Sequence, residues 1–144
     1  MLGELTATEI DQLLREQVVA RIGCHHAGTT YVVPITYVFY RGAVIGHSAD
    51  GMKLRMMRAN PNVCVEVDQM SDLGNWRSVV AWGRFTELSG ELALAARHQL
   101  AIRLHPLIAI GSKPASHALD PLRVAEATVY HITLDRKTGR FERN

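Results

Sequence analysis

The sequence is poor in several features that would each point to a class of protein. It has no apolar run of about 18 residues, the length that a membrane-spanning helix needs, so no such helix is expected. It has two cysteines, Cys24 and Cys64, too few for a disulfide framework, and both are predicted to be free thiols in strands. The 16 Lys and Arg are scattered and the net charge is only +2, which argues against nucleic acid as a partner. The first residues lack a basic segment followed by an apolar one, so we expect no secretory signal and a cytoplasmic protein.

The common nucleotide and metal motifs are missing too. No G-x-x-x-x-G-K-[ST] or G-x-G-x-x-G pattern occurs, which argues against a P-loop enzyme and against a Rossmann domain. No Cys-x-x-Cys or His-Glu-x-x-His pattern occurs, so no metal site is predicted. The run Gly46-His47-Ser48-Ala49-Asp50 approaches the nucleophile elbow of hydrolases but lacks its second glycine, which leaves a hydrolase as a minor interpretation.

The length and composition are those of one globular domain. Of the 144 residues, 47% are apolar and 21% are charged. We therefore predict a single domain over residues 1–144.

Three helices are predicted. Thr6 and Glu9 form a capping-box pattern, which starts a short N-terminal helix over residues 6–17. A short helix is predicted over 52–60, where Asn60 and Pro61 stop it. The Ala- and Leu-rich stretch 91–104 predicts the third helix, ended by Pro106. It belongs to a helical insertion and loop at about 89–125, with a surface loop over 111–121.

Six segments have the alternation and the β-branched or aromatic content of strands: 18–24, 30–40, 43–46, 63–68, 78–88 and 128–135. Residues 69–75 are predicted to form a polar connection and 137–139 a polar turn. Gly83 is predicted to mark a bulge or a close approach of backbones. Six strands with interrupting helices predict a small barrel flanked by helices.

Two residues fit this pattern poorly unless a ligand is present. Pro34 lies inside a strand pattern but has no N–H for a ladder hydrogen bond, so it belongs at an edge, at a bulge or where something other than a strand docks. Lys53 falls in the first turn of a predicted helix, where its charge opposes the helix dipole unless an anion is bound. A planar, phosphorylated ligand would explain both positions.

Several short motifs occur in a characteristic order along the chain: Val33-Pro34-Ile35, His47-Ser48-Ala49, Gly51-Met52-Lys53-Leu54, Arg58-Ala59-Asn60-Pro61-Asn62-Val63, Trp76-Arg77-Ser78-Val79-Val80-Ala81-Trp82-Gly83-Arg84 and Val129-Tyr130-His131-Ile132-Thr133-Leu134-Asp135. This ordered set resembles the FMN-binding split barrels of the pyridoxamine 5′-phosphate oxidase-like superfamily. It looks closest to the branch that contains the nitroimidazole-resistance (Nim) proteins. The resemblance covers roughly residues 16–140 and is weakest between 88 and 125.

The resemblance implies a mainly β fold with flanking helices (α+β), a six-stranded antiparallel split β-barrel. It also implies a homodimer with FMN at the subunit interface, and it assigns cofactor-binding residues. The isoalloxazine edge would lie along Val33, Pro34, Ile35 and Thr36, mostly through backbone groups. His47 and Ser48 would lie near the ring and the ribityl phosphate, and Lys53 would bind the phosphate. Ser78, with Trp76 and Arg77 beside it, falls where related oxidases carry a flavin-contacting glutamine.

The function expected from this resemblance is an FMN-dependent oxidoreductase that passes electrons to a small organic acceptor, nitroaromatic or quinone-like. His47 is the candidate catalytic residue, placed to donate a proton or hydrogen bond near the acceptor. The chain departs from true pyridoxamine phosphate oxidases. Those enzymes carry an arginine where this sequence has Met52 and a basic residue where it has Thr36, and they have a C-terminal tryptophan-and-arginine segment that is not found here. Pyridoxamine phosphate is therefore not expected as the substrate.

Each candidate residue also has a plainer interpretation. Lys53 could be a surface lysine, Ser48 could cap the following helix, and His47 could be a half-buried histidine bonded to backbone. Trp76 and Trp82 are interpreted as core or interface aromatics. A different class of function is a non-catalytic flavin- or haem-binding sensor on the same barrel, and haem and deazaflavin remain alternative cofactors.

Overall fold

The computed structural model describes residues 1–110 and 127–144. The elements in chain order are β1 (Leu2–Glu4), α1 (Ala7–Glu16), β2 (Val19–His26), β3 (Thr29–Tyr40), β4 (Ala43–Ser48), α2 (Met52–Ala59), β5 (Asn62–Asp72), β6 (Asn75–Glu87), α3 (Gly90–Ile110) and β7 (Thr128–Glu142).

The strands form one antiparallel sheet that closes on itself. The order in the described residues is β1-β7-β4-β3-β2-β5-β6, and β6 also pairs with β7 along nearly its whole length. Six strands therefore make a ring, and β1 adds to the end of β7. The predicted mainly β fold with a six-stranded antiparallel split barrel is confirmed.

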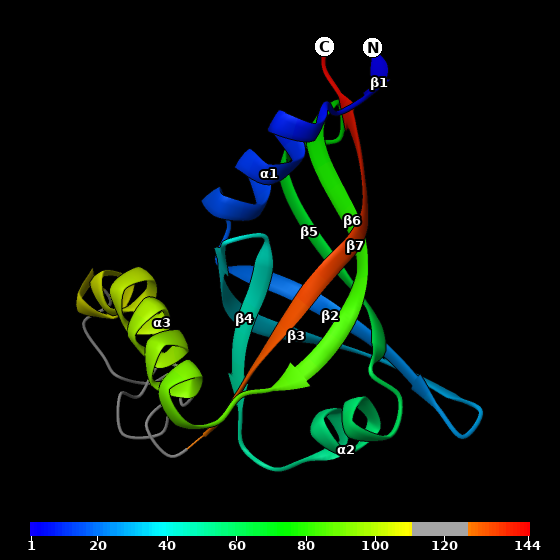
Figure 1. The fold of residues 1–144 in the computed structure, drawn as a ribbon. Coiled ribbons are helices and arrows are strands. Elements are labelled where there is room, and N and C mark those ends of the chain that lie inside the picture. The colour runs from blue at the N-terminus through cyan, green and yellow to red at the C-terminus, as the bar shows by residue number, and fades with distance from the viewer. Residues whose placement is uncertain (111–126) are drawn as a thin grey trace.

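The helices cover different parts of this barrel. In Figure 1, α1 and both termini lie at one end, α2 lies across the other end, and α3 runs beside β4. Leu13 and Leu14 of α1 and Leu54 and Met57 of α2 are fully buried in the core inside the barrel. A second cluster packs α3 onto the outer face of β4 and β7 through Leu100. Helices α1 and α2 thus close the two ends of the barrel, and α3 covers one side of it.

Local sequence explains the hairpins that connect the first strands. Ala27 and Gly28 have φ angles of 49° and 80°, and Arg41 and Gly42 have φ angles of 50° and 78°. Two consecutive residues with positive φ form the two-residue turn whose twist matches that of paired strands. The capping box at α1 is also present, since Thr6 Oγ1 accepts from the Glu9 N–H and Glu9 Oε1 accepts from the Thr6 N–H.

Three element predictions are wrong, and each error has a physical reason. Residues 69–75 are not a polar connection, because β5 continues to Asp72 and β6 begins at Asn75. Residues 137–139 are not a turn, because β7 runs through them paired to β6. Residues 69–72 are exposed, which suits their mostly polar side chains, and pairing between β5 and β6 keeps them in strand conformation. Gly139 is a buried strand residue, and glycine fits there because Leu5 and Ile10 occupy the space that a Cβ would need.

The third error concerns Pro106, which does not end α3. The helix continues to Ile110 with the proline inside it. Proline has no N–H, so one backbone hydrogen bond of the helix is missing, but the fixed φ of proline is compatible with a helix. The predicted bulge at Gly83 is confirmed, since the β6–β7 register shifts between Trp82 and Gly83. The loop predicted over 111–121 lies outside the described residues.

Candidate functional site

Pro34 lies where its missing N–H breaks no hydrogen bond. The N–H of Tyr37 donates to the carbonyl of Val18 at 3.0 Å, so it points toward the β2 side. Since N–H groups alternate sides along a strand, position 34 points away from β2. β4 pairs only with the residues from Tyr37 to Tyr40, so no strand of residues 1–110 and 127–144 lies beside Pro34 on that side. The sequence prediction of an edge position for Pro34 is confirmed.

This part of β3 leaves an open edge of backbone groups. By the same alternation, Val32 and Thr36 direct their N–H and C=O groups to the side that lacks a strand. Ile35 is 6% exposed, with its side chain in the core, and can offer a ligand only backbone. Val33 is half-buried and Pro34 is exposed. A flat polar ring could hydrogen-bond along this edge as a strand would.

Lys53 lies in the first turn of α2 and is half-buried. Among the described residues no carboxylate lies within ion-pair distance of its ammonium group. Burial lowers the pKa of Lys53, and the neighbouring Cys24 thiol opposes this to a lesser extent. A half-buried cation without a counter-ion is costly to keep in the folded protein, and an anionic ligand would remove that cost.

The start of α2 adds to this preference for an anion. The N-cap residue is Gly51, with no side-chain hydrogen bond, and the first turn carries no acidic residue. Within the described ranges, no side chain caps the first N–H groups of the helix, and such groups favour negative charge. The other basic residues of α2 are turned outward, since Arg55 and Arg58 are exposed and Arg58 pairs with Glu87 and Asp50.

His47 is the penultimate residue of β4, and it lies close enough to Lys53 to be affected by its charge. Its Nε2 lies 3.4 Å from Oγ1 of Thr36 on the neighbouring strand. Burial, and then the charge of Lys53, lowers the pKa of His47. The imidazole is therefore uncharged at neutral pH. In this form it can donate or accept a hydrogen bond, but it carries no extra proton to give up. Among the described residues, the side-chain partner of His47 is the Thr36 hydroxyl.

Ser48 follows on the same strand and is also half-buried. Its hydroxyl donates to the carbonyl of Ala49 at 2.8 Å. It therefore does not cap α2, whose N-cap is Gly51. Thr36 of β3 thus contacts His47 of β4, and His47 lies close enough to Lys53 of α2 to be affected by its charge. Ser48 is next to His47, and Pro34 is two residues before Thr36 on β3.

The remaining predicted residues, at the start of β6, lie at the other end of the barrel and are engaged within the chain. Trp76 donates its indole N–H to Glu142 at 3.2 Å. Arg77 donates to Glu16 at 3.0 Å and also to Gln69. Ser78 is half-buried opposite Arg140 of β7.

The two groups of predicted residues cannot meet within one chain. His47 pairs with Val129 of β7, and Ser78 pairs with Arg140 of the same strand. These partners are eleven residues apart, roughly 37 Å of extended strand. A single bound ligand of FMN size cannot contact both groups in one copy of the protein.

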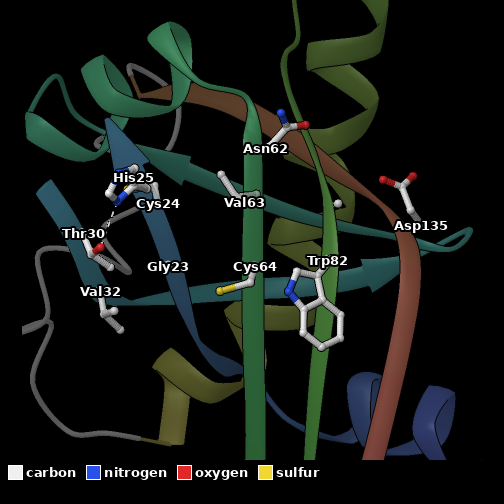
Figure 2. A pocket seen from close by; sticks show the side chains of 11 residues that line it. Gly23, Cys24, His25, Thr30, Val32, Asn62, Val63, Cys64, Trp82 and Asp135 are labelled. Carbon is white, nitrogen blue, oxygen red and sulfur yellow. Dashed lines mark hydrogen bonds between the residues drawn. The ribbon is translucent and has the colours of Figure 1, made fainter. Parts of the chain in front are cut away.

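A cavity of about 370 Å³ on the outer face of β2, β5 and β6 was missed by sequence reasoning (Figure 2). Its lining includes Gly23, Val32, Cys64 and Trp82. The guanidinium of Arg136 lies 4.1 Å from the centre of the Trp82 ring. The sequence offered one signal for this cavity, which is the pair of small residues Gly23 and Cys64 in neighbouring strands. The Cys64 side chain lies in the space that a Cβ at Gly23 would need.

No described group of three or more His, Cys, Asp or Glu residues could hold a metal ion. Among the described helices, none has the length and apolarity needed to cross a bilayer.

Comparison with known protein families identifies the family of this chain. The sequence model of the pyridoxamine 5′-phosphate oxidase family matches residues 6–141. The chain belongs to this family. A Rhizobium meliloti relative named uncharacterized protein RA0666 is 31% identical over 130 residues, which cover 85% of this chain and 83% of the relative.

Solved structures of the pyridoxamine 5′-phosphate oxidase-like fold agree with this assignment. A FAD-binding protein from Mesorhizobium loti is 29% identical, with a TM-score of 0.79 and 98% of both chains covered. A putative 5-nitroimidazole antibiotic resistance protein from Bacteroides thetaiotaomicron is 18% identical, with a TM-score of 0.71 over 98% of this chain and 87% of that one. A FAD and haem binding protein from Mycobacterium smegmatis is 16% identical, with a TM-score of 0.71 over 99% and 74%. The last two show the fold alone.

Proposed function

We propose that this chain is a flavoprotein that binds FMN or a related flavin nucleotide where β3, β4 and α2 meet. The observation that carries the proposal is the half-buried ammonium of Lys53, without a carboxylate partner in the described residues, beside an uncapped helix start. The open edge of β3 offers backbone groups for a flat ring, and Thr36 on that edge contacts His47, whose pKa the charge of Lys53 lowers. The flavin-binding description of the Mesorhizobium loti protein supports the same cofactor class.

A homodimer is part of the proposal. The start of β6, with Trp76, Arg77 and Ser78, lies too far along the barrel to reach the Lys53 region of its own chain. In a pair of antiparallel copies, the β6 start of one subunit could lie beside the Lys53 region of the other. The cavity beside Trp82 is apolar and open on the outer face, which suits contact with a second subunit.

The proposed activity is electron transfer from a reduced donor to a small organic acceptor, nitroaromatic or quinone-like, in the cytoplasm. When bound, the flavin would supply the redox chemistry. Lys53 would hold the phosphate, and the β3 edge would orient the ring. His47 is neutral because of burial and of Lys53, so its ring N–H can hydrogen-bond an acceptor oxygen without adding a permanent charge.

Cofactor binding tests the proposal directly. Purified protein titrated with FMN should quench flavin fluorescence and turn yellow at one equivalent per subunit. Lys53→Ala should weaken FMN binding by about 30-fold or more but riboflavin binding by less than about threefold, because riboflavin has no phosphate. Arg55→Ala, an exposed cation on the same helix, is the matched control and should leave both affinities unchanged.

Two outcomes would reject the proposal in different ways. Equal losses for FMN and riboflavin in Lys53→Ala would remove Lys53 from the phosphate site. A colourless protein that binds neither, or one that takes up haem with a Soret band instead, would favour the sensor or haem alternative. For the catalytic step, full acceptor reduction by a flavin-loaded His47→Ala variant would show that His47 has no role in it.

A further inference from the structure

The outer face of β2, β5 and β6 has an unusual composition for a sheet surface in water. Among the described helices, α1 and α2 lie at the barrel ends and α3 lies beside β4, so none of them covers this face (Figure 1). The solvent-facing side of an antiparallel sheet is normally polar. Here the half-buried side chains of Cys64, Val80 and Trp82, with exposed Val32 of the adjoining β3, make an apolar strip beside the 370 Å³ cavity (Figure 2).

The end of this face nearest α1 carries more acidic than basic groups. Glu66 and Asp68 of β5 share the guanidinium of Arg21 on β2, at distances of 3.5 Å and 3.2 Å. Burial, and then the hydrogen bond and charge of Asp68, raises the pKa of Glu66 to about 7, and Arg21 opposes this rise. The next cation, Arg140 of β7, is separated from the pair by Ser78 of β6. One cation therefore does not balance the two carboxylates of this acidic cluster, which consists of Arg21, Glu66 and Asp68.

The end of the same face nearest α2 carries the opposite imbalance. Arg84 of β6 is exposed and is paired in register with Asn62 of β5. Arg136 of β7 is exposed and places its guanidinium 4.1 Å from the centre of the Trp82 ring. Within residues 1–110 and 127–144 neither arginine has a carboxylate at ion-pair distance. The cavity lining adds one carboxylate, Asp135, so two arginines outnumber it here.

Strand register relates these two ends to the proposed homodimer. Asp68 pairs with Ser78, and Cys64 pairs with Trp82, so the two ends are four residues apart along β6, roughly 13 Å. A second copy that reaches Ser78 therefore also lies over Asp68 beside it. In an antiparallel pair, the α2 end of that second copy lies over the α1 end of the first, which brings two arginines onto the acidic cluster.

We propose that two copies of this chain pair through the outer face of β2, β5 and β6, with the acidic cluster of each copy against Arg84 and Arg136 of the other. This inference rests on the homodimer of the proposed function and adds which face meets and what aligns the two copies. A two-fold contact is self-complementary, so the same charge pairing occurs twice. Complementary charges fix the register of such a contact, and the apolar strip supplies its buried core.

Charge-reversed variants test which groups face each other. One variant carries Glu66→Lys with Asp68→Lys, and the other carries Arg84→Glu with Arg136→Glu. Each alone should have a dimer Kd raised by about 30-fold or more, because both charge contacts of its homodimer become repulsive. An equimolar mixture should restore dimers, since both contacts between the two variants are attractive. Analytical ultracentrifugation, with and without FMN, measures this, and restoration also shows that both variants are folded.

A second pair of variants tests the apolar part of the face. Val32 is 62% exposed in one copy, so Val32→Glu should leave the fold intact but weaken the dimer by about tenfold, because it buries a charge in the contact. Leu94→Glu is the matched control on α3, where the side chain is 70% exposed and lies outside this face. It should leave the dimer Kd unchanged.

The outcomes separate this inference from the proposed function. If the mixture of charge-reversed variants stays monomeric while the unmodified chain forms dimers, the charge pairing is wrong. Dimers that survive Val32→Glu but not Leu94→Glu would place the interface on α3, and the homodimer would stand without this face. An unmodified chain that stays monomeric would overturn both this inference and the homodimer, whereas flavin binding at Lys53 is judged by its own titration.

Discussion

At the barrel end covered by α1, Arg77 and Arg143 have partners within the chain, whereas at the α2 end Lys53 has no carboxylate partner among the described residues. Arg77 donates to Glu16 and Gln69, and Arg143 donates to Glu9. At the other end Lys53 is half-buried with no carboxylate in reach among the described residues, and burial lowers its pKa. Both ends carry basic residues from motifs that resemble a flavin site.

The contrast shows how structure separates two kinds of basic residue. A cation with an internal partner contributes to stability and needs no ligand. A cation desolvated without a partner costs stability, and proteins retain such groups chiefly at functional sites. The α2 end is therefore where a ligand would be bound by a single chain, and the α1 end could contribute only through a second copy.

The largest effect on stability is expected at the α1 end. Arg77→Met should lower the free energy of unfolding by about 1–2 kcal/mol, because it removes an ion pair and a hydrogen bond and leaves Glu16 without its partner. Urea denaturation measures this. Arg143→Met is the control and should cost less, since that pair is more exposed. If Arg77→Met left stability unchanged but weakened flavin binding, the contrast between the two barrel ends would be wrong, and Arg77 would be a residue that binds the flavin.

The opposite sign is expected at the α2 end. Lys53→Met should raise the free energy of unfolding of the flavin-free protein by about 1 kcal/mol, because a half-buried charge is replaced by an apolar chain of similar length. Arg55→Met on the exposed face should change it by less than about 0.5 kcal/mol. If Lys53→Met is destabilising, then Lys53 has a structural partner and the contrast between the ends is lost.

The smallest effect concerns the titration of His47. Its pKa is lowered below the ordinary value of 6.5 by burial and by Lys53. The folded state therefore binds the proton less well than the unfolded state, and stability is lost as the pH falls below 6.5 toward the folded-state pKa. NMR should show a His47 midpoint below 6.5 that moves upward in Lys53→Met. An unmoved midpoint would mean that the two groups do not interact.

The sequence predicted local features well where a short pattern decides the conformation. The capping box of Thr6 and Glu9, the Arg41-Gly42 turn and the edge position of Pro34 all follow from properties of one or two residues. It failed where pairing with a distant strand overrides polarity. β7 runs through residues 137–139 because β6 pairs with it there, and no pattern within those three residues reveals that partner.

The candidate site divides in the same way. Pro34 and Lys53 were singled out by their own chemistry. The structure places Pro34 in the part of β3 that β4 does not pair with, and Lys53 in the first turn of α2 near His47. Ser78 was chosen by resemblance to a family, and its distance from Lys53 depends on how β6 and β7 pair along the barrel. The Trp82 cavity escaped notice because its lining comes from separate strands.

By itself, the sequence determined which residues have unusual requirements: a proline without a hydrogen to donate, and a lysine at the positive end of a helix dipole. Only the tertiary structure decided that the lysine is half-buried with no carboxylate partner among the described residues, that it lies near His47, and that the β6 residues lie at the other end. The reason is that burial and the distance between charges depend on strands far apart in the chain, whereas backbone chemistry is fixed at each residue.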